Sequence, residues 1–103
     1  MEQFNEFKQN LDMFSGYLSV DPDIRYFESG KCKATFSIPL SKGKDSETLW
    51  LNCECWGRIA EKAGEELKKG SEVLVLGYFK EVEYEAKDKT KKKKIVFIVK
   101  GVI

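Results

Sequence analysis

Two tryptophans lie six residues apart within a segment, residues 48–57, in which polar and apolar side chains alternate. Alternation of this kind predicts a β-strand with one buried face. The buried face of that strand would carry Leu49, Leu51, Cys53 and Cys55, and the exposed face would carry Trp50, Asn52, Glu54 and Trp56. Large aromatic rings on a polar face are typical of a surface that stacks against a planar ligand, which makes Trp50 and Trp56 candidate binding residues. The alternative is that a helix, a loop or a second subunit covers both rings.

A dense group of positive charges follows near the C-terminus. Its members are Lys87, Lys89, Lys91, Lys92, Lys93 and Lys94. Because the net charge of the chain is only +1, this local density matters more than the total. It is typical of a hairpin arm that contacts phosphates, and the alternative is a solubilising loop or a protected edge strand. Directly before it, Glu81, Glu83 and Glu85 alternate along the chain and would repel phosphates on their side.

The chain offers little for catalysis or metal binding. It has three cysteines, Cys32, Cys53 and Cys55, and no histidine. Structural zinc usually takes four cysteine or histidine ligands, and cysteines on the apolar face of a strand behave as small hydrophobic residues. Without histidine the commonest general base is missing, and no pair of carboxylates is placed for acid–base work. We therefore predict a protein that is not an enzyme and needs no cofactor or metal.

Length and composition indicate one small globular domain. A chain of 103 residues can bury a core of its own without disulfides. Charged residues make up 34% and hydrophobic residues 42%, and no apolar run approaches the roughly 18 residues of a membrane span. The first residues are acidic where a secretory signal would be basic. We expect a soluble, cytoplasmic protein that does not bind membranes.

Turn-forming residues divide the chain into five strands and one helix. The predicted strands cover residues 13–20, 31–40, 48–57, 72–85 and 95–99, with residues 25–27 extended. A helix is predicted over residues 58–69, since Ile59, Ala63 and Leu67 recur every four residues and Gly70 follows as a cap. The fourth strand is long, and Gly77 gives it a place to bend.

This order of elements matches a known all-β architecture. Five strands with one helix between strands three and four, and a bent fourth strand, predict the OB-fold, a five-stranded Greek-key barrel. We expect residues 1–12 to be an N-terminal extension and residues 13–103 to form the OB-fold domain.

Four stretches along this framework resemble the bacterial-type single-stranded DNA-binding proteins (SSB). Residues 16–26, GYLSVDPDIRY, resemble the opening strand and turn of that family, and residues 29–38, SGKCKATFSI, resemble its second strand. Residues 56–61, WGRIAE, resemble the start of its helix, and residues 67–77, LKKGSEVLVLG, resemble the helix exit and the fourth strand. The stretches occur in the family's order, and the resemblance covers nearly all of residues 13–103.

The resemblance implies a sequence-independent binder of single-stranded DNA that serves replication, repair or recombination, and it leaves RNA binding open. It places Trp50, Trp56 and Tyr84 at positions where the family stacks aromatic rings on bases, and Arg58 where a phosphate contact is common. The lysines correspond to the family's last hairpin arm. The predicted DNA-binding residues are therefore Trp50, Trp56, Arg58, Tyr84, Lys87, Lys89, Lys91, Lys92, Lys93 and Lys94.

Several features depart from the family pattern. The loop over residues 41–46 is short and lacks a tryptophan found in many members, Asn52 replaces a basic residue, and glutamates stand in the fourth strand. These departures favour an alternative, an OB-fold protein-interaction module with weak or no DNA binding. The chain also lacks the linker and acidic tail through which members recruit replication enzymes, so we expect no such recruitment. Short relatives occur in bacteria, phages and plastids, and a plastid location is the alternative to the cytoplasm.

The first strand predicts self-association. It would form an edge of the barrel, and Met13, Phe14, Tyr17 and Leu18 make that edge unusually apolar. SSB-like proteins pair such strands across a two-fold axis, so the resemblance implies a homodimer or homotetramer. Phe4 and Phe7 have helical spacing and are expected to contribute to the contact.

Overall fold

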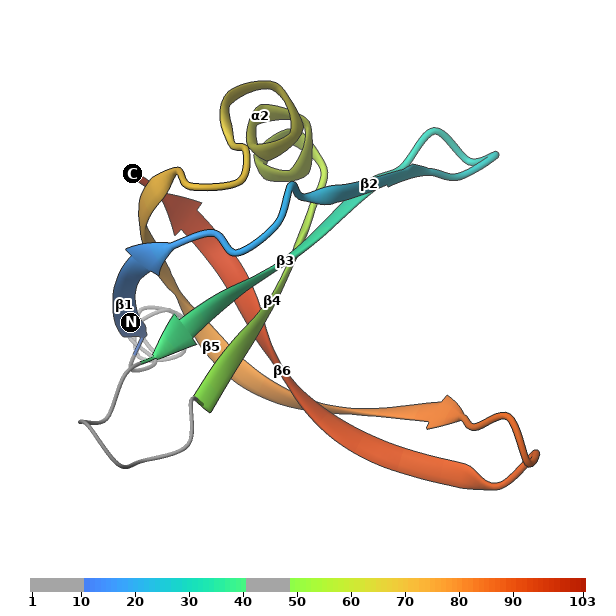
Figure 1. The fold of residues 1–103 in the computed structure, drawn as a ribbon. Coiled ribbons are helices and arrows are strands. Elements are labelled where there is room, and N and C mark those ends of the chain that lie inside the picture. Colours follow the sequence, from blue (N-terminus) through green and yellow to red (C-terminus); the bar gives the residue numbers. More distant parts are fainter. Residues whose placement is uncertain (1–10, 41–48) are drawn as a thin grey trace, which may run out of the picture.

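The computed structural model describes residues 11–40 and 49–103. Within these residues the chain forms one six-stranded sheet and one helix (Figure 1). The elements are β1 (Asp12–Tyr17), β2 (Asp23–Tyr26), β3 (Cys32–Leu40), β4 (Leu49–Trp56), α2 (Arg58–Glu66), β5 (Glu72–Glu85) and β6 (Lys91–Val102). The strand order is β1-β5-β6-β4-β3-β2, and all neighbours are antiparallel except the short parallel pair of β4 and β6. No helix in the described part of the chain is long and apolar enough to cross a membrane.

All the predicted elements are present; the long strand over residues 72–85 has the predicted bounds, and the others differ at one end or both. The first two residues of the predicted extended segment, 25 and 26, belong to a true strand, β2, which pairs with β3, and Phe27 follows it. The predicted helix end was wrong: α2 stops at Glu66 because Leu67 is already extended, and Gly70 makes a separate turn. The last strand starts at Lys91 rather than at residue 95, so four of the predicted arm lysines lie within a strand.

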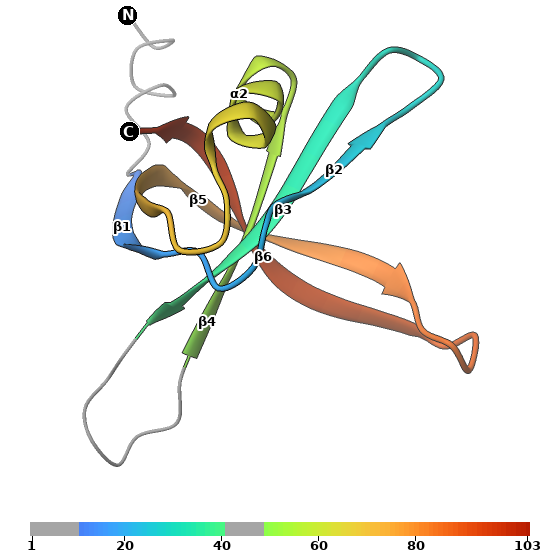
Figure 2. The same ribbon diagram turned by 45° about the horizontal axis from the view of Figure 1, so that its top comes forward.

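The long strand β5 is irregular at Gly77. Its pairing with β6 shifts register between Leu76 and Gly77, and a Cβ atom at Gly77 would collide with the carbonyl oxygen of Ile98. The predicted irregularity at this glycine is therefore confirmed. Beyond it, β5 and β6 continue as a long hairpin that projects from the body of the molecule, as does the β2–β3 hairpin (Figure 2).

Gly77→Ala is expected to lower the free energy of unfolding by about 1–3 kcal/mol, because the added methyl group would force backbone atoms apart. Gly101→Ala on the paired strand is the matched control, since its Cβ would lie 3.8 Å from Leu76 Cδ1, an ordinary contact. Denaturant unfolding of both variants measures the difference. Equal stabilities would show that β5 and β6 do not approach this closely.

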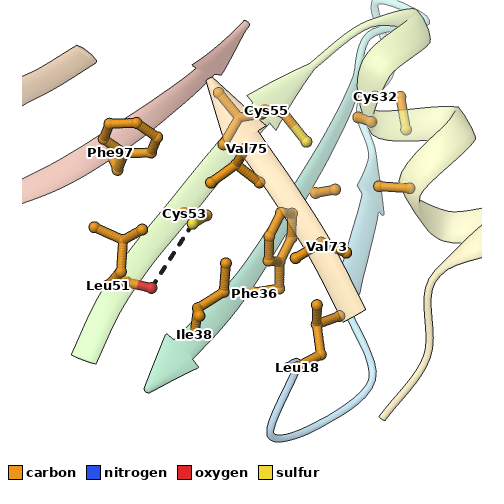
Figure 3. Packing of buried hydrophobic residues seen from close by; sticks show 14 residues of the cluster. Leu18, Cys32, Phe36, Ile38, Leu51, Cys53, Cys55, Val73, Val75 and Phe97 are labelled. Atoms are coloured by element: carbon orange, nitrogen blue, oxygen red, sulfur yellow. Dashed lines mark hydrogen bonds between the residues drawn. The ribbon is translucent and has the colours of Figure 1, made fainter. Parts of the chain in front are cut away.

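The core lies inside the curved sheet, between β5 on one side and β3 and β4 on the other (Figure 3), and α2 contributes Ala60 and Ala63 to it. Leu51, Cys53 and Cys55 are buried, whereas Trp50 and Trp56 are 53% and 42% exposed, so the predicted alternation is confirmed from Trp50 onward. Leu49, also predicted to be buried, is 45% exposed at the first position of β4. The three cysteines are free and buried. Burial raises the pKa of Cys53 to about 12 and that of Cys55 to about 11, which keeps both thiols protonated and unreactive at neutral pH.

The two ends of the sheet approach each other without a continuous ladder. β1 and β2 are the terminal strands in the sheet order, and within the described residues β1 has ladder bonds only to β5. Gly16 of β1 nevertheless lies against Ile38 of β3, so close that a Cβ on Gly16 would stand 2.5 Å from Ile38 Cγ2. The structure is thus a strongly curved, mostly β architecture with its helix between β4 and β5.

Candidate nucleic-acid interface

The polar face of β4 continues onto β3. Cross-strand partners share a face of the sheet, and the register pairs Trp56 with Lys33, Glu54 with Thr35, Asn52 with Ser37, and Trp50 with Pro39. The Ser37 hydroxyl donates a hydrogen bond to Asn52 Oδ1 over 3.1 Å. Polar side chains therefore connect the two tryptophans along the outside of the sheet.

Strand β6 borders this polar surface. Lys94 and Val96 of β6, together with residues of β3 and β4 and the segment around β2, line a shallow hollow that we call the groove. Its polar and charged lining residues are Asp21, Asp23, Lys33, Thr35, Ser37, Asn52, Glu54 and Lys94. A second small hollow adjoins it and is lined by Asp23, Arg25, Lys33, Thr35 and Lys94, with Arg25 paired to Asp23 over 3.5 Å. The groove thus places an arm lysine near the polar face of β4.

Strand pairing separates the arm lysines onto two faces. Lys92 lies opposite Tyr84 and Lys94 lies opposite Val82, on the face that includes the groove. Lys94 Nζ is 5.3 Å from the centre of the Tyr84 ring, close enough for a cation–π contact. The structure therefore brings Tyr84, Lys92 and Lys94 together.

The other two strand lysines point to the opposite face with the glutamates. Lys91 lies opposite Glu85 and Lys93 opposite Glu83, and Lys93 Nζ is 3.7 Å from a carboxylate oxygen of Glu81. The glutamates that would repel phosphates consequently face away from the groove.

The tip of the arm carries Lys87 and Lys89. Both are exposed in the turn between β5 and β6, where Lys89 has a positive φ of 66°. Asp88 orders this turn by accepting hydrogen bonds from the backbone N–H and the hydroxyl of Thr90, at 3.1 and 2.6 Å. These hydrogen bonds lower the pKa of the Asp88 carboxyl, so the tip carries one carboxylate beside its lysines at neutral pH.

Trp56 has close neighbours that the sequence did not reveal. Its indole N–H donates to Glu54 Oε2 over 3.0 Å, and Lys33 Nζ lies 3.3 Å from Glu54 Oε1 and 5.5 Å from the indole centre. The ring of Phe27 stacks on the indole with 5.7 Å between centres and 19° between planes. No sequence signal marked Phe27 or Lys33, because finding them requires the registers of β2 with β3 and of β3 with β4.

Arg58 lies at the far end of the same face. It is the first residue of α2 and follows Gly57, whose φ of 68° turns the chain from β4 into the helix. Together with Trp56, Lys31 and Glu61 it lines a further hollow. Of the predicted binding residues, Arg58 and Trp56 are therefore adjacent, while Trp50 lies toward the other end of β4.

The predicted oligomer edge is only partly on the surface. Met13 and Tyr17 are exposed, but Leu18 is buried and Phe14 packs edge-on against Phe79 and Phe97. A strand alternates its side chains, so Phe14 and Leu18 belong to the core and only the other two can meet a partner. Phe4 and Phe7, also predicted to contribute, lie outside the described residues, as does the loop over residues 41–46.

Comparison with known proteins gives a consistent family. A model described as the single-strand binding protein family matches residues 10–102. A protein of Fusobacterium nucleatum named single-stranded DNA-binding protein is 34% identical over 87 residues, which are 78% of this chain and 56% of the relative. Single-stranded DNA-binding protein 1 of Nostoc sp. is 38% identical over 72 residues, 69% of this chain and 60% of the relative. The chain spans little more than half the length of these curated relatives.

Proposed function

The chain belongs to the single-strand binding protein family, and we propose that it binds single-stranded DNA without sequence preference. The family is non-enzymatic, so the activity is binding alone. Membership also implies the OB-fold, and we propose that the curved sheet closes into its barrel where Gly16 of β1 lies against Ile38 of β3. In this role the protein would protect unpaired strands in the bacterial cytoplasm during replication, repair or recombination.

One observation carries the proposal: exposed aromatic rings and lysines share the groove face. Lys92, Lys94 and Lys33 would attract the phosphate backbone and release counterions. Bases would stack on Trp50, Trp56 and Tyr84, each contributing about 1–3 kcal/mol without hydrogen-bond readout. Unpaired strands are preferred because only they can turn their bases onto the rings.

The register of the arm favours DNA binding over the protein-interaction alternative. That alternative was motivated partly by Glu81, Glu83 and Glu85, which here lie on the face opposite the groove beside Lys91 and Lys93. Within the described residues, Lys92 and Lys94 have no carboxylate within ion-pair distance. Lys92 and Lys94 consequently face the groove side without a neighbouring glutamate of β5, and the carboxylates that share the groove with Lys94 are those of Asp21, Asp23 and Glu54.

A titration with labelled oligo-dT, followed by fluorescence anisotropy at low and moderate salt, tests the proposal. Oligo-dT and a mixed-sequence strand should bind with similar affinity, and a hairpin duplex of equal charge should bind much more weakly. Affinity should fall as salt rises. If oligo-dT does not bind even at low salt, the protein-interaction module is the better description.

We further propose that the protein acts as a homodimer or a larger homo-oligomer built on β1. Within the described residues β1 has ladder bonds to β5 alone, and this together with its exposed Met13 and Tyr17 supports an isologous contact in which two copies of the strand pair. Such pairing would join two groove faces on one DNA strand and raise the effective concentration of the second site. Light scattering at micromolar concentration gives the mass, and a monomer would rule this out.

Glu54→Gln is expected to tighten binding of single-stranded DNA roughly 2- to 5-fold, or about 0.5–1 kcal/mol. The Glu54 carboxylate lies in the groove and holds Lys33, so an incoming phosphate must compete with it. Glutamine keeps an acceptor for the Trp56 indole N–H but removes the charge. Glu83→Gln, which makes the same charge change on the opposite face, is the control, and equal gains in both variants would assign the effect to net charge.

A further inference from the structure

Phe27 is an exposed aromatic residue for which neither the family resemblance nor the sequence pattern assigned a role. It follows β2 at the tip of the β2–β3 hairpin and is 43% exposed. Its ring lies nearly parallel to that of Trp56, itself 42% exposed. A pair of stacked rings in a core would be closed to solvent. This pair instead leaves ring surface open on the face that carries the groove.

The two rings belong to separate, hydrogen-bonded parts of the backbone. The N–H of Phe27 donates to the carbonyl of Lys31 over 2.9 Å, and the carbonyl of Phe27 accepts from the N–H of Gly30 over 2.8 Å. On the other side, the Trp56 indole is fixed by Glu54, and the next residue, Gly57, donates its N–H to the Cys32 carbonyl over 2.9 Å. The backbone bonds fix where both residues lie, and the stack on the hydrogen-bonded indole orients the Phe27 ring in the absence of ligand, which reduces the ordering cost of binding.

Positive charges stand on both sides of the stacked pair. On one side, Lys33 Nζ lies 5.5 Å from the indole centre, and Lys33 also lines the groove. Beyond Trp56, Lys31 and Arg58 line the adjoining hollow, which also includes Glu61. A flat apolar surface flanked by cations at either side suits one nucleotide, with its base on the ring and its phosphates near the cations.

We propose that Phe27 is an additional base-stacking residue that, with Trp56, forms a two-ring platform at the end of the groove. A base stacks on Phe27, whose other ring face rests on Trp56, and the neighbouring phosphate contacts Lys31 and Arg58. This proposal rests on single-stranded DNA binding. Phe27 would thus provide a ring for base stacking in addition to those of Trp50, Trp56 and Tyr84.

Replacement of Phe27 tests this directly, with labelled oligo-dT as the probe. Phe27→Ala should weaken binding roughly 5- to 100-fold, as expected for the loss of one stacked base. Tyr26→Ala is the matched control: Tyr26 is the preceding aromatic residue, is 71% exposed, and points to the other side of the hairpin. It should bind like the parent protein, and circular dichroism should show that both variants are folded.

A second pair of variants separates stacking from support of Trp56. Phe27→Leu keeps an apolar group that can pack against the indole but has no aromatic face, whereas Phe27→Tyr keeps the face. The proposal expects Phe27→Leu to bind as weakly as Phe27→Ala and Phe27→Tyr to bind like the parent. Parent-like affinity of Phe27→Leu would overturn it.

The same titrations separate the role of Phe27 from DNA binding by the protein as a whole. If the parent protein binds oligo-dT and Phe27→Ala binds equally well, only the role of Phe27 is wrong. If the parent protein does not bind oligo-dT at low salt, the proposed function is wrong, and the proposed role of Phe27 is wrong as well.

Discussion

Trp50→Ala combined with Trp56→Ala is expected to weaken single-stranded DNA binding by about 2–6 kcal/mol, the sum of two stacked bases. Six residues separate the two rings on one strand, a distance of about 20 Å, so their contributions should add. Both rings are substantially exposed, and their removal takes little from the core. Anisotropy titrations of the two single variants and the double variant measure the sum.

Stability provides the control for this expectation. The free energy of unfolding of Trp50→Ala should lie within about 0.5 kcal/mol of that of the parent. Trp56→Ala should lower it further, because the indole also packs on Phe27 and donates a hydrogen bond to Glu54. Tyr26→Ala removes an exposed aromatic residue from another face and should not affect binding. A tryptophan variant could instead lose stability while its folded fraction binds oligo-dT with the affinity of the parent. That result would mean that the ring stabilises the fold and does not contact DNA.

A double replacement of Lys92 and Lys94 by glutamine is expected to reduce affinity for every base composition. The dependence of log K on log salt should become shallower by about 0.7 for each phosphate that a lysine no longer neutralises, or about 1.4 in all. The matched variant replaces Lys91 and Lys93. It removes the same charge from the same strand, but from side chains that lie beside Glu81, Glu83 and Glu85 on the opposite face.

The comparison between these two variants decides how the arm works. The Lys91 and Lys93 variant should keep a nearly parental salt slope, although its affinity will drop modestly through long-range electrostatics. Equal slopes in the two variants would mean that the arm acts through total charge and that the separation of its faces is irrelevant to DNA. The slope is read from titrations over a series of salt concentrations.

Local patterns were sufficient to predict most of the fold. The alternation along β4 predicted which side chains are buried except at Leu49, and Gly77 predicted the irregularity in β5, because both depend only on residues near each other in the sequence. The end of α2 was not predictable in this way. Leu67 continues the spacing of the helix stripe, yet it packs against the core from an extended backbone.

The candidate site depends on strand registers that local patterns do not specify. Whether a lysine of β6 faces the groove or the glutamates follows from its partner on β5, and a slip of one residue would exchange the two faces. In the same way, the contact of Phe27 with Trp56 arises only when β2, β3 and β4 are aligned. The sequence therefore predicted which aromatic and basic residues are candidates for binding, but not which of them share a face of the sheet.

An NMR titration with oligo-dT tests the central claim most directly, because the chain has only two indole N–H groups, those of Trp50 and Trp56. If the groove face binds single-stranded DNA, both indole signals and the backbone amides of Lys92 and Lys94 should shift in proportion to bound DNA. The amide of Glu83, on the strand that pairs with these lysines, should move much less. Binding that leaves both indole signals in place and shifts amides elsewhere would contradict the account.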